Sequence, residues 1–152
     1  MIRKLNHQDP DVAKKIRAVF QVSYAVEAKL LNAIDFPPLK RTLDEYLETE
    51  TQFYGFWKDN ALAAVVEIKR YEETTHIQSL VVDPKYFRQG IAHQLTAFVF
   101  NTFDSEKYMV ETGLANKPAV MLYKKHGFKE VMQYDTDHGI RKIRLESKGK
   151  NK

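Results

Sequence analysis

The segment from Ile77 to Phe103 constrains the fold of this chain more than any other part of the sequence. It opens with an apolar run that ends at Asp83-Pro84, crosses a short basic loop, and then repeats apolar residues at helical spacing. Because proline has no N–H group and interrupts a central strand, the strand must end near Pro84. The pattern predicts a strand, a loop and a helix. A second short strand is expected from Met109 to Thr112. Together these elements predict a βαβ unit from Thr75 to Thr112 that contains one parallel pair of strands.

The loop between this strand and helix is suited to an anion. Gly90 has no Cβ, so a ligand can approach its backbone, and the unpaired N–H groups of the first helical turn carry a partial positive charge. Lys85 and Arg88 add full charges. A phosphate or pyrophosphate would fit, although an ordinary strand-to-helix turn explains the loop equally well. Gly-x-Gly-x-x-Gly and Gly-x-x-x-x-Gly-Lys-Ser/Thr are absent, which argues against a dinucleotide fold and a P-loop NTPase.

A second segment, residues 107–128, has the pattern of a short strand followed by a capped helix. Asn116 is a natural N-cap, and Pro118 lies in the first turn, where a missing N–H group costs little. Gly127 is the residue expected just beyond the helix, and Phe128 begins another strand.

Together the two segments resemble the GCN5-related N-acetyltransferase (GNAT) family. The first family motif, Val-x-Pro followed by Arg/Gln-x-x-Gly-x-Gly/Ala, is matched by Val82-Asp83-Pro84 and Gly90-Ile91-Ala92, with Phe87 in place of the first Arg or Gln. The second motif is matched at Asn116, Ala119, Leu122, Tyr123, Lys125, Gly127 and Phe128. The two motifs cover about a third of the chain.

The resemblance implies a mixed α/β fold of the acyl-CoA N-acyltransferase type, with the element order β-α-α-β-β-β-α-β-α-β-β. The chain follows this order. Helices are expected after Pro10, from Thr42 to Leu47, after Gly90 and after Asn116, and strands are expected at the other places in this order. We expect residues 1–147 to form one domain and residues 148–152 to be a basic, disordered tail.

The resemblance also implies acetyl-CoA as cosubstrate and direct transfer of its acetyl group to a primary amine of a small molecule or protein. A non-catalytic CoA or acyl-CoA sensor of the same fold is the alternative. The expected cofactor-binding residues are Leu80, Val81, Val82, Arg88, Gln89, Gly90, Ile91, Ala92, Asn116 and Tyr123.

Four residues are considered for catalysis. Tyr123 stands where many family members place the acid that protonates the leaving sulfur, and a phenol (reference pKa about 10) suits a thiolate (about 8.5). His76 and Glu111 are candidates for the general base, with Glu67 as a rival acting through water; an exposed strand residue is the plainer interpretation of each. Tyr24, Glu27, Phe36 and Tyr46 are expected to border the acceptor groove, although amphipathic packing explains them as well.

Composition limits the remaining possibilities. A chain of 152 residues can bury one proper core, and the absence of cysteine excludes disulfides and a cysteine nucleophile. The net charge of +4 suits an anionic ligand such as CoA but is too small to argue for nucleic acid. The histidines lack metal-ligand spacing, so no metal site is expected. Without a signal peptide or an apolar run of membrane-spanning length, we expect a cytoplasmic protein that does not bind membranes; a homodimer is compatible with these expectations.

Overall fold

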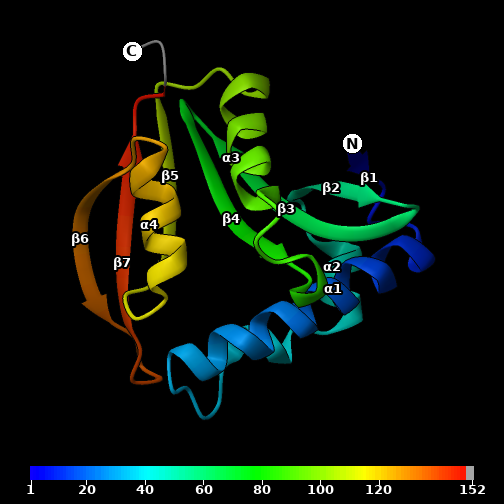
Figure 1. Ribbon diagram of the computed structural model, residues 1–152, viewed down its shortest axis with the longest axis horizontal. Coiled ribbons are helices and arrows are strands. Elements are labelled where there is room, and N and C mark those ends of the chain that lie inside the picture. The colour runs from blue at the N-terminus through cyan, green and yellow to red at the C-terminus, as the bar shows by residue number, and fades with distance from the viewer. Residues whose placement is uncertain (150–152) are drawn as a thin grey trace.

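The computed structural model describes residues 1–149, and Lys150–Lys152 of the predicted tail lie outside the described residues (Figure 1). The strands are β1 (Ile2–Leu5), β2 (Gln52–Lys58), β3 (Ala61–Tyr71), β4 (Thr74–Val82), β5 (Lys107–Gly113), β6 (Lys129–Asp135) and β7 (Arg141–Ser147). The helices are α1 (Pro10–Leu30), α2 (Leu43–Glu48), α3 (Ile91–Thr102) and α4 (Lys117–Lys125), with short 3₁₀ turns η1 (Pro37–Lys40) and η2 (Pro84–Tyr86).

The seven strands form one mixed sheet in the order β1-β2-β3-β4-β5-β7-β6. Only β4 and β5 pair in parallel; the other neighbours are antiparallel. Helices α3 and α4 lie together on one face, as Figure 1 shows, while α1 and α2 pack in a separate cluster on the other. The predicted fold class and element order are confirmed; the two 3₁₀ turns were not predicted.

Local sequence signals explain why the helices begin and end where they do. Asp9 caps α1 by accepting the amide of Asp11 at 2.9 Å. Thr42 and Glu45 form the predicted capping box of α2, in which each side chain accepts the other residue's amide. Such caps satisfy N–H groups that a helix cannot pair internally, and each stabilises its helix by about 1 kcal/mol.

Two apolar clusters cover the two faces of the sheet. Helix α3 contributes Ile91, Leu95 and Val99 to the first cluster, one helical turn apart and almost fully buried. Helix α1 contributes Ile16 and Phe20 to the second. Burying a side chain of this size stabilises the fold by about 1.5–3 kcal/mol. The helices are therefore fixed on the sheet, and they hold the central strands between them.

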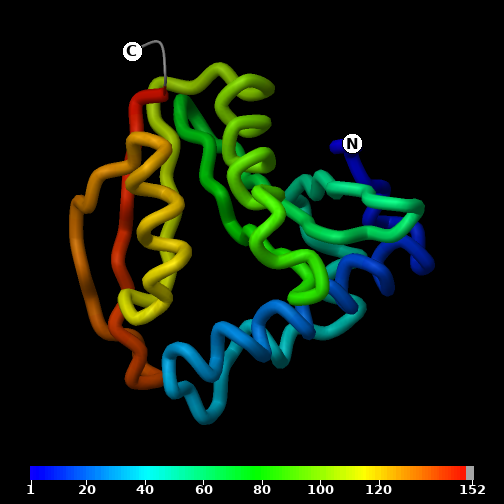
Figure 2. Tube along the Cα trace, viewed as in Figure 1, coloured from blue at the N-terminus to red at the C-terminus, as the bar shows by residue number. Residues whose placement is uncertain are grey.

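The parallel pair β4–β5 is short. It runs only from Thr74–Lys107 to Ile77–Val110, although both strands continue further. The register between β3 and β4 shifts at this point, so that Gln78 has no partner on β3. Beyond this bulge β4 and β5 diverge, as the Cα trace in Figure 2 shows. No helix in residues 1–149 is long and apolar enough to cross a membrane.

Candidate functional site

A cavity of about 490 Å³ opens where β4 and β5 diverge, between α1, α3 and α4. We call it the first cavity. Of the cofactor-binding residues expected from the sequence, all except Val81 and Gln89 line it. The side chain of Val81 is 1% exposed and packs on the opposite face, in the α1 cluster. The side chain of Gln89 instead accepts a hydrogen bond from the Lys58 ammonium group.

One end of the first cavity is the loop that leads into α3. Arg88 and Gly90 both adopt left-handed backbone conformations, with φ of +64° and +76°. A Cβ built on Gly90 would meet nothing within 4 Å, so the space over this residue is open. Gly90 caps α3 without a side chain, and the first helical amides, including those of Ile91 and Ala92, have no acceptor within the helix. This open cradle of N–H groups beside the Arg88 guanidinium fits a diphosphate.

The unpaired edges of the two strands form the walls of the first cavity. Beyond the short parallel ladder, residues 78–82 of β4 and 111–113 of β5 lack each other as partners. A strand edge offers backbone N–H and C=O groups to an extended ligand, which can insert like an additional strand. The two edges can therefore hold a linear polar chain such as pantetheine.

A second cavity of about 610 Å³ lies on the α1 side of the sheet. Its wall includes Phe36, Pro37 and Pro38 from the segment that follows α1. It shares five lining residues with the first cavity: Tyr24, Glu27, Gln78, Glu111 and Thr112. We call these five residues the junction. Ligands that enter from opposite faces of the sheet would meet there.

Glu27 is the carboxylate most firmly positioned at the junction. Its Oε1 accepts Asn116 Nδ2 at 2.9 Å and Thr112 Oγ1 at 3.3 Å. Asn116 also caps α4, because its Oδ1 accepts the Ala119 amide at 3.4 Å. Burial raises the pKa of Glu27, whereas these two hydrogen bonds and the charge of Lys142 oppose the shift. Glu27 thereby links α1 to the start of α4 across the end of β5.

Tyr123 projects from α4 into the first cavity and is 4% exposed. Its ring packs edge-on against Phe128, with 5.5 Å between centroids. Within residues 1–149 its hydroxyl makes no hydrogen bond. Burial raises the pKa of Tyr123, and the nearby Glu27 and Tyr24 raise it further. The phenol therefore stays protonated and can donate into the cavity.

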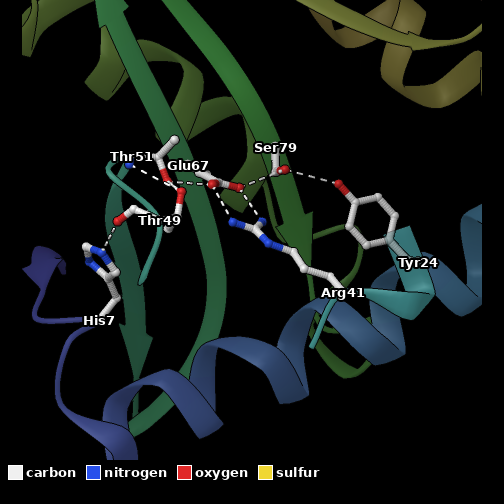
Figure 3. A network of polar contacts seen from close by, with 7 residues as sticks. All are labelled: His7, Tyr24, Arg41, Thr49, Thr51, Glu67 and Ser79. Carbon is white, nitrogen blue, oxygen red and sulfur yellow. Dashed lines mark hydrogen bonds and ion pairs between the residues drawn. The ribbon is translucent and has the colours of Figure 1, made fainter. Parts of the chain in front are cut away.

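A chain of polar contacts reaches Tyr24 from the interior (Figure 3). The Tyr24 hydroxyl donates to Ser79 Oγ at 3.2 Å, and Ser79 donates to Glu67 Oε1 at 3.1 Å. Arg41 binds both oxygens of Glu67, at 2.8 and 2.9 Å, and Thr51 donates to Oε2 at 2.6 Å. Glu67 is 0% exposed and both of its oxygens are occupied. It holds Tyr24 through Ser79, and its hydrogen bonds leave neither oxygen open to a ligand.

The two candidates for the general base have different positions. His76 lines neither cavity, and burial lowers its pKa against the opposing charge of Glu111. Glu111 lies at the junction, but its Oε2 accepts Arg144 Nε at 3.0 Å in an ion pair. Both assignments stay predictions, and of the two side chains only that of Glu111 lines the cavities.

The residues expected around the acceptor groove are also divided. Tyr24 and Glu27 lie at the junction, and Phe36 lines the second cavity with its ring 5.8 Å from that of Tyr24. Tyr46 is 0% exposed, lines neither cavity and packs between Phe20 and the Arg41 guanidinium. Its ring is therefore part of the core in this structure.

Sequence reasoning missed several polar residues of the site. Gln78 and Ser79 interrupt the apolar run from Ile77 to Val82, and that interruption was the available signal. Thr112 left no local signal, and neither did the ion pair of Arg41 with Glu67, which the sequence suggested only as a possible base. His93, which lines the first cavity, contacts His126 across α3 and α4, with Nδ1 and Nε2 2.9 Å apart. No group of three or more metal-ligating side chains exists within residues 1–149.

Comparison with known proteins gives three kinds of match. A model of the acetyltransferase (GNAT) domain matches residues 25–148. The UPF0157 protein YqkA of Bacillus subtilis (strain 168) is 30% identical over 141 residues, which are 92% of this chain and 41% of that protein. The chain thus spans less than half the length of this curated relative.

Solved structures agree in fold at low identity. The ribosomal-protein-S18-alanine N-acetyltransferase of Escherichia coli has a TM-score of 0.74 at 18% identity, covering 97% of this chain and 92% of that one. The PaiA N-acetyltransferase of Thermoplasma acidophilum, in complex with coenzyme A, has a TM-score of 0.75 at 18% identity, covering 97% and 98%. The family match, which includes both motif segments, is decisive: the chain belongs to the GNAT acetyltransferase family, whose cosubstrate is acetyl-CoA.

Proposed function

We propose that this protein is an N-acetyltransferase that moves the acetyl group of acetyl-CoA directly to a primary amine of a small molecule or protein. The observation that carries this proposal is the pair of cavities that meet between the diverging strands β4 and β5. A cytoplasmic location and a homodimeric assembly stay predictions.

Different parts of the first cavity would bind different parts of the cosubstrate. The amides around Gly90 and the Arg88 side chain would hold the diphosphate, and the free edge of Leu80–Val82 would bind the pantetheine. When bound, acetyl-CoA supplies a thioester whose acetyl carbon accepts the amine. Along this path Tyr123 and Asn116 lie on the α4 side of the cavity, near the junction.

Tyr123 would act as the acid. A thiolate leaves more readily when a neighbouring group protonates it, and the buried phenol keeps its proton because its pKa is raised by burial and by the charge of Glu27. The chain has no cysteine to form a thioester with the acetyl group, which fits direct transfer.

The second cavity would receive the amine. Tyr24 and Phe36 provide aromatic surface there, and Glu27 provides a carboxylate that attracts an ammonium group. A polyamine, an aminoglycoside, an amino acid and a protein amine all present such a group.

The test is release of free thiol from acetyl-CoA with a panel of amines: spermidine, kanamycin, L-lysine and a peptide with a free N-terminus. Turnover of at least one amine above the rate without acceptor is the expected result. CoA binding by calorimetry without turnover of any amine would favour the sensor alternative. The sensor alternative rests on Phe87, which stands in place of the first Arg or Gln of the loop motif and is 43% exposed at the first cavity.

A further inference from the structure

We propose that Glu27 is the catalytic base that takes the proton from the acceptor amine. The inference rests on the proposed function and adds to it the proton acceptor that the two motifs leave unassigned. It starts from the position of Glu27 on α1, outside both motif segments, at the one place where the two cavities meet.

The hydrogen bonds of Glu27 leave half of its carboxylate available. Asn116 Nδ2 and Thr112 Oγ1 both donate to Oε1, at 2.9 and 3.3 Å. No side chain or amide within residues 1–149 donates to Oε2. A carboxylate whose one oxygen is fixed by two donors has a defined orientation, and its second oxygen can bind an N–H group of a ligand.

The other carboxylates near the junction are less suitable. Glu67 binds Arg41 with both oxygens and accepts two hydroxyls in addition. Glu111 is held in the ion pair with Arg144, whose Nε already donates to its Oε2 at 3.0 Å. Within residues 1–149 no cation is bound to Glu27, and Lys142, on β7, influences it only through its charge.

The groups that face Glu27 from the surrounding elements determine its titration. They are Lys142 on β7, Tyr24 on α1 itself and Tyr123 on α4, with Glu111 of β5 sharing the junction. Burial raises the pKa of Glu27 above its ordinary value. A raised pKa brings a carboxylate closer to the pH at which it works, which makes it a better base.

The proton balance assigns a role to each group. An ammonium acceptor loses two protons from nitrogen during the reaction. Glu27 removes the first, and the freed lone pair forms the C–N bond with the acetyl carbon. The C–S bond then breaks, and Tyr123 gives its proton to the sulfur. The second nitrogen proton restores Tyr123, and Glu27 returns the first to solvent, so one proton is released per turnover.

The experiment compares wild type with Glu27→Gln, using whichever amine of the panel turns over. Glutamine keeps the size of the side chain and can still accept from Asn116, but it cannot accept a proton. We expect kcat to fall about 100-fold or more, while the affinity for CoA by calorimetry is unchanged. In wild type kcat should fall as the pH drops through the pKa of Glu27, and this decline should be absent from the variant. Glu27→Asp should have a kcat between those of Glu27→Gln and wild type, and its kcat should again fall at low pH.

Two comparison variants sharpen the result. Glu111→Gln should retain the decline of kcat at low pH, and Glu48→Gln, an exposed residue that lines neither cavity, should behave as wild type. If Glu27→Gln does not fold, carboxyl-¹³C NMR of wild type must show one glutamate with a raised pKa that matches the kinetic decline, and that signal must be missing from Glu27→Asp.

The outcomes separate the inference from the function on which it rests. Active wild type with an unchanged kcat and pH profile in Glu27→Gln overturns the role of Glu27 and leaves the acetyltransferase intact. Wild type that binds CoA but acetylates no amine overturns both.

Discussion

The Arg41–Glu67 pair allows the sharpest test of what holds the site together. Glu67 is 0% exposed, and Arg41 occupies both of its oxygens with a side chain that is 20% exposed. Replacing Arg41 by leucine leaves a buried carboxylate with only the hydroxyls of Thr51 and Ser79 as partners. Removing one member of such a pair costs about 3–5 kcal/mol, which is a large fraction of the 5–15 kcal/mol that stabilises an ordinary domain.

Urea unfolding followed by the fluorescence of Trp57, the only tryptophan, measures this loss. With a slope of about 1.5–2 kcal/mol per molar urea, the midpoint should fall by roughly 1.5–3 M.

Lys40→Leu is the matched control, because the neighbouring Lys40 binds Asp35 in an ion pair whose two side chains are each 63% exposed. Its midpoint should not change. The double variant Arg41→Leu/Glu67→Leu should regain more than half of the loss, since an apolar pair removes the buried charge. If Arg41→Leu and Lys40→Leu have the same midpoint, the reasoning about the buried pair is refuted.

Three further predictions concern the cavities. Tyr123→Phe should leave CoA affinity and the unfolding midpoint unchanged, because the hydroxyl has no hydrogen bond within residues 1–149, but should lower kcat about 100-fold; an unchanged kcat would exclude Tyr123 as the acid. Gly90→Val and Gly139→Val should each cost about 1–2 kcal/mol in urea unfolding, since both glycines have φ of +76° and open space around them, yet only Gly90→Val should weaken CoA binding by calorimetry. Asn116→Ala should lower the free energy of unfolding by about 1 kcal/mol through the lost cap of α4. It should also move the low-pH decline of kcat to higher pH, because a hydrogen bond that lowers the pKa of Glu27 is gone. A decline that stays at the same pH would show that it does not come from the titration of Glu27.

The features that the sequence predicted well have local causes. The strand end at Pro84, the loop at Gly90 and the helix capped by Asn116 all depend on residues within a few positions of one another. Their backbone preferences act before any tertiary contact forms, so the pattern of residues is sufficient to locate them. The element order followed from these units and from the rules for connecting them.

The features that escaped prediction depend on contacts between distant parts of the chain. Glu27 meets Asn116 across 89 positions, and Arg41 meets Glu67 across 26. An amphipathic helix specifies which of its faces is apolar but not what covers that face. Tyr46 could therefore be assigned to a groove or, more plainly, to the core, where it lies.

The short parallel ladder from Thr74–Lys107 to Ile77–Val110 divides the sheet into two parts, β1 to β4 and β5 to β7. Beyond Ile77–Val110 the backbones of β4 and β5 are not paired with each other. A pantetheine arm lying along both free strand edges would form the backbone hydrogen bonds that β4 and β5 do not form with each other. The cosubstrate would then join the two parts of the sheet while presenting its acetyl group between them. Amide exchange in β5 and β7 would then slow when CoA is added, in proportion to occupancy.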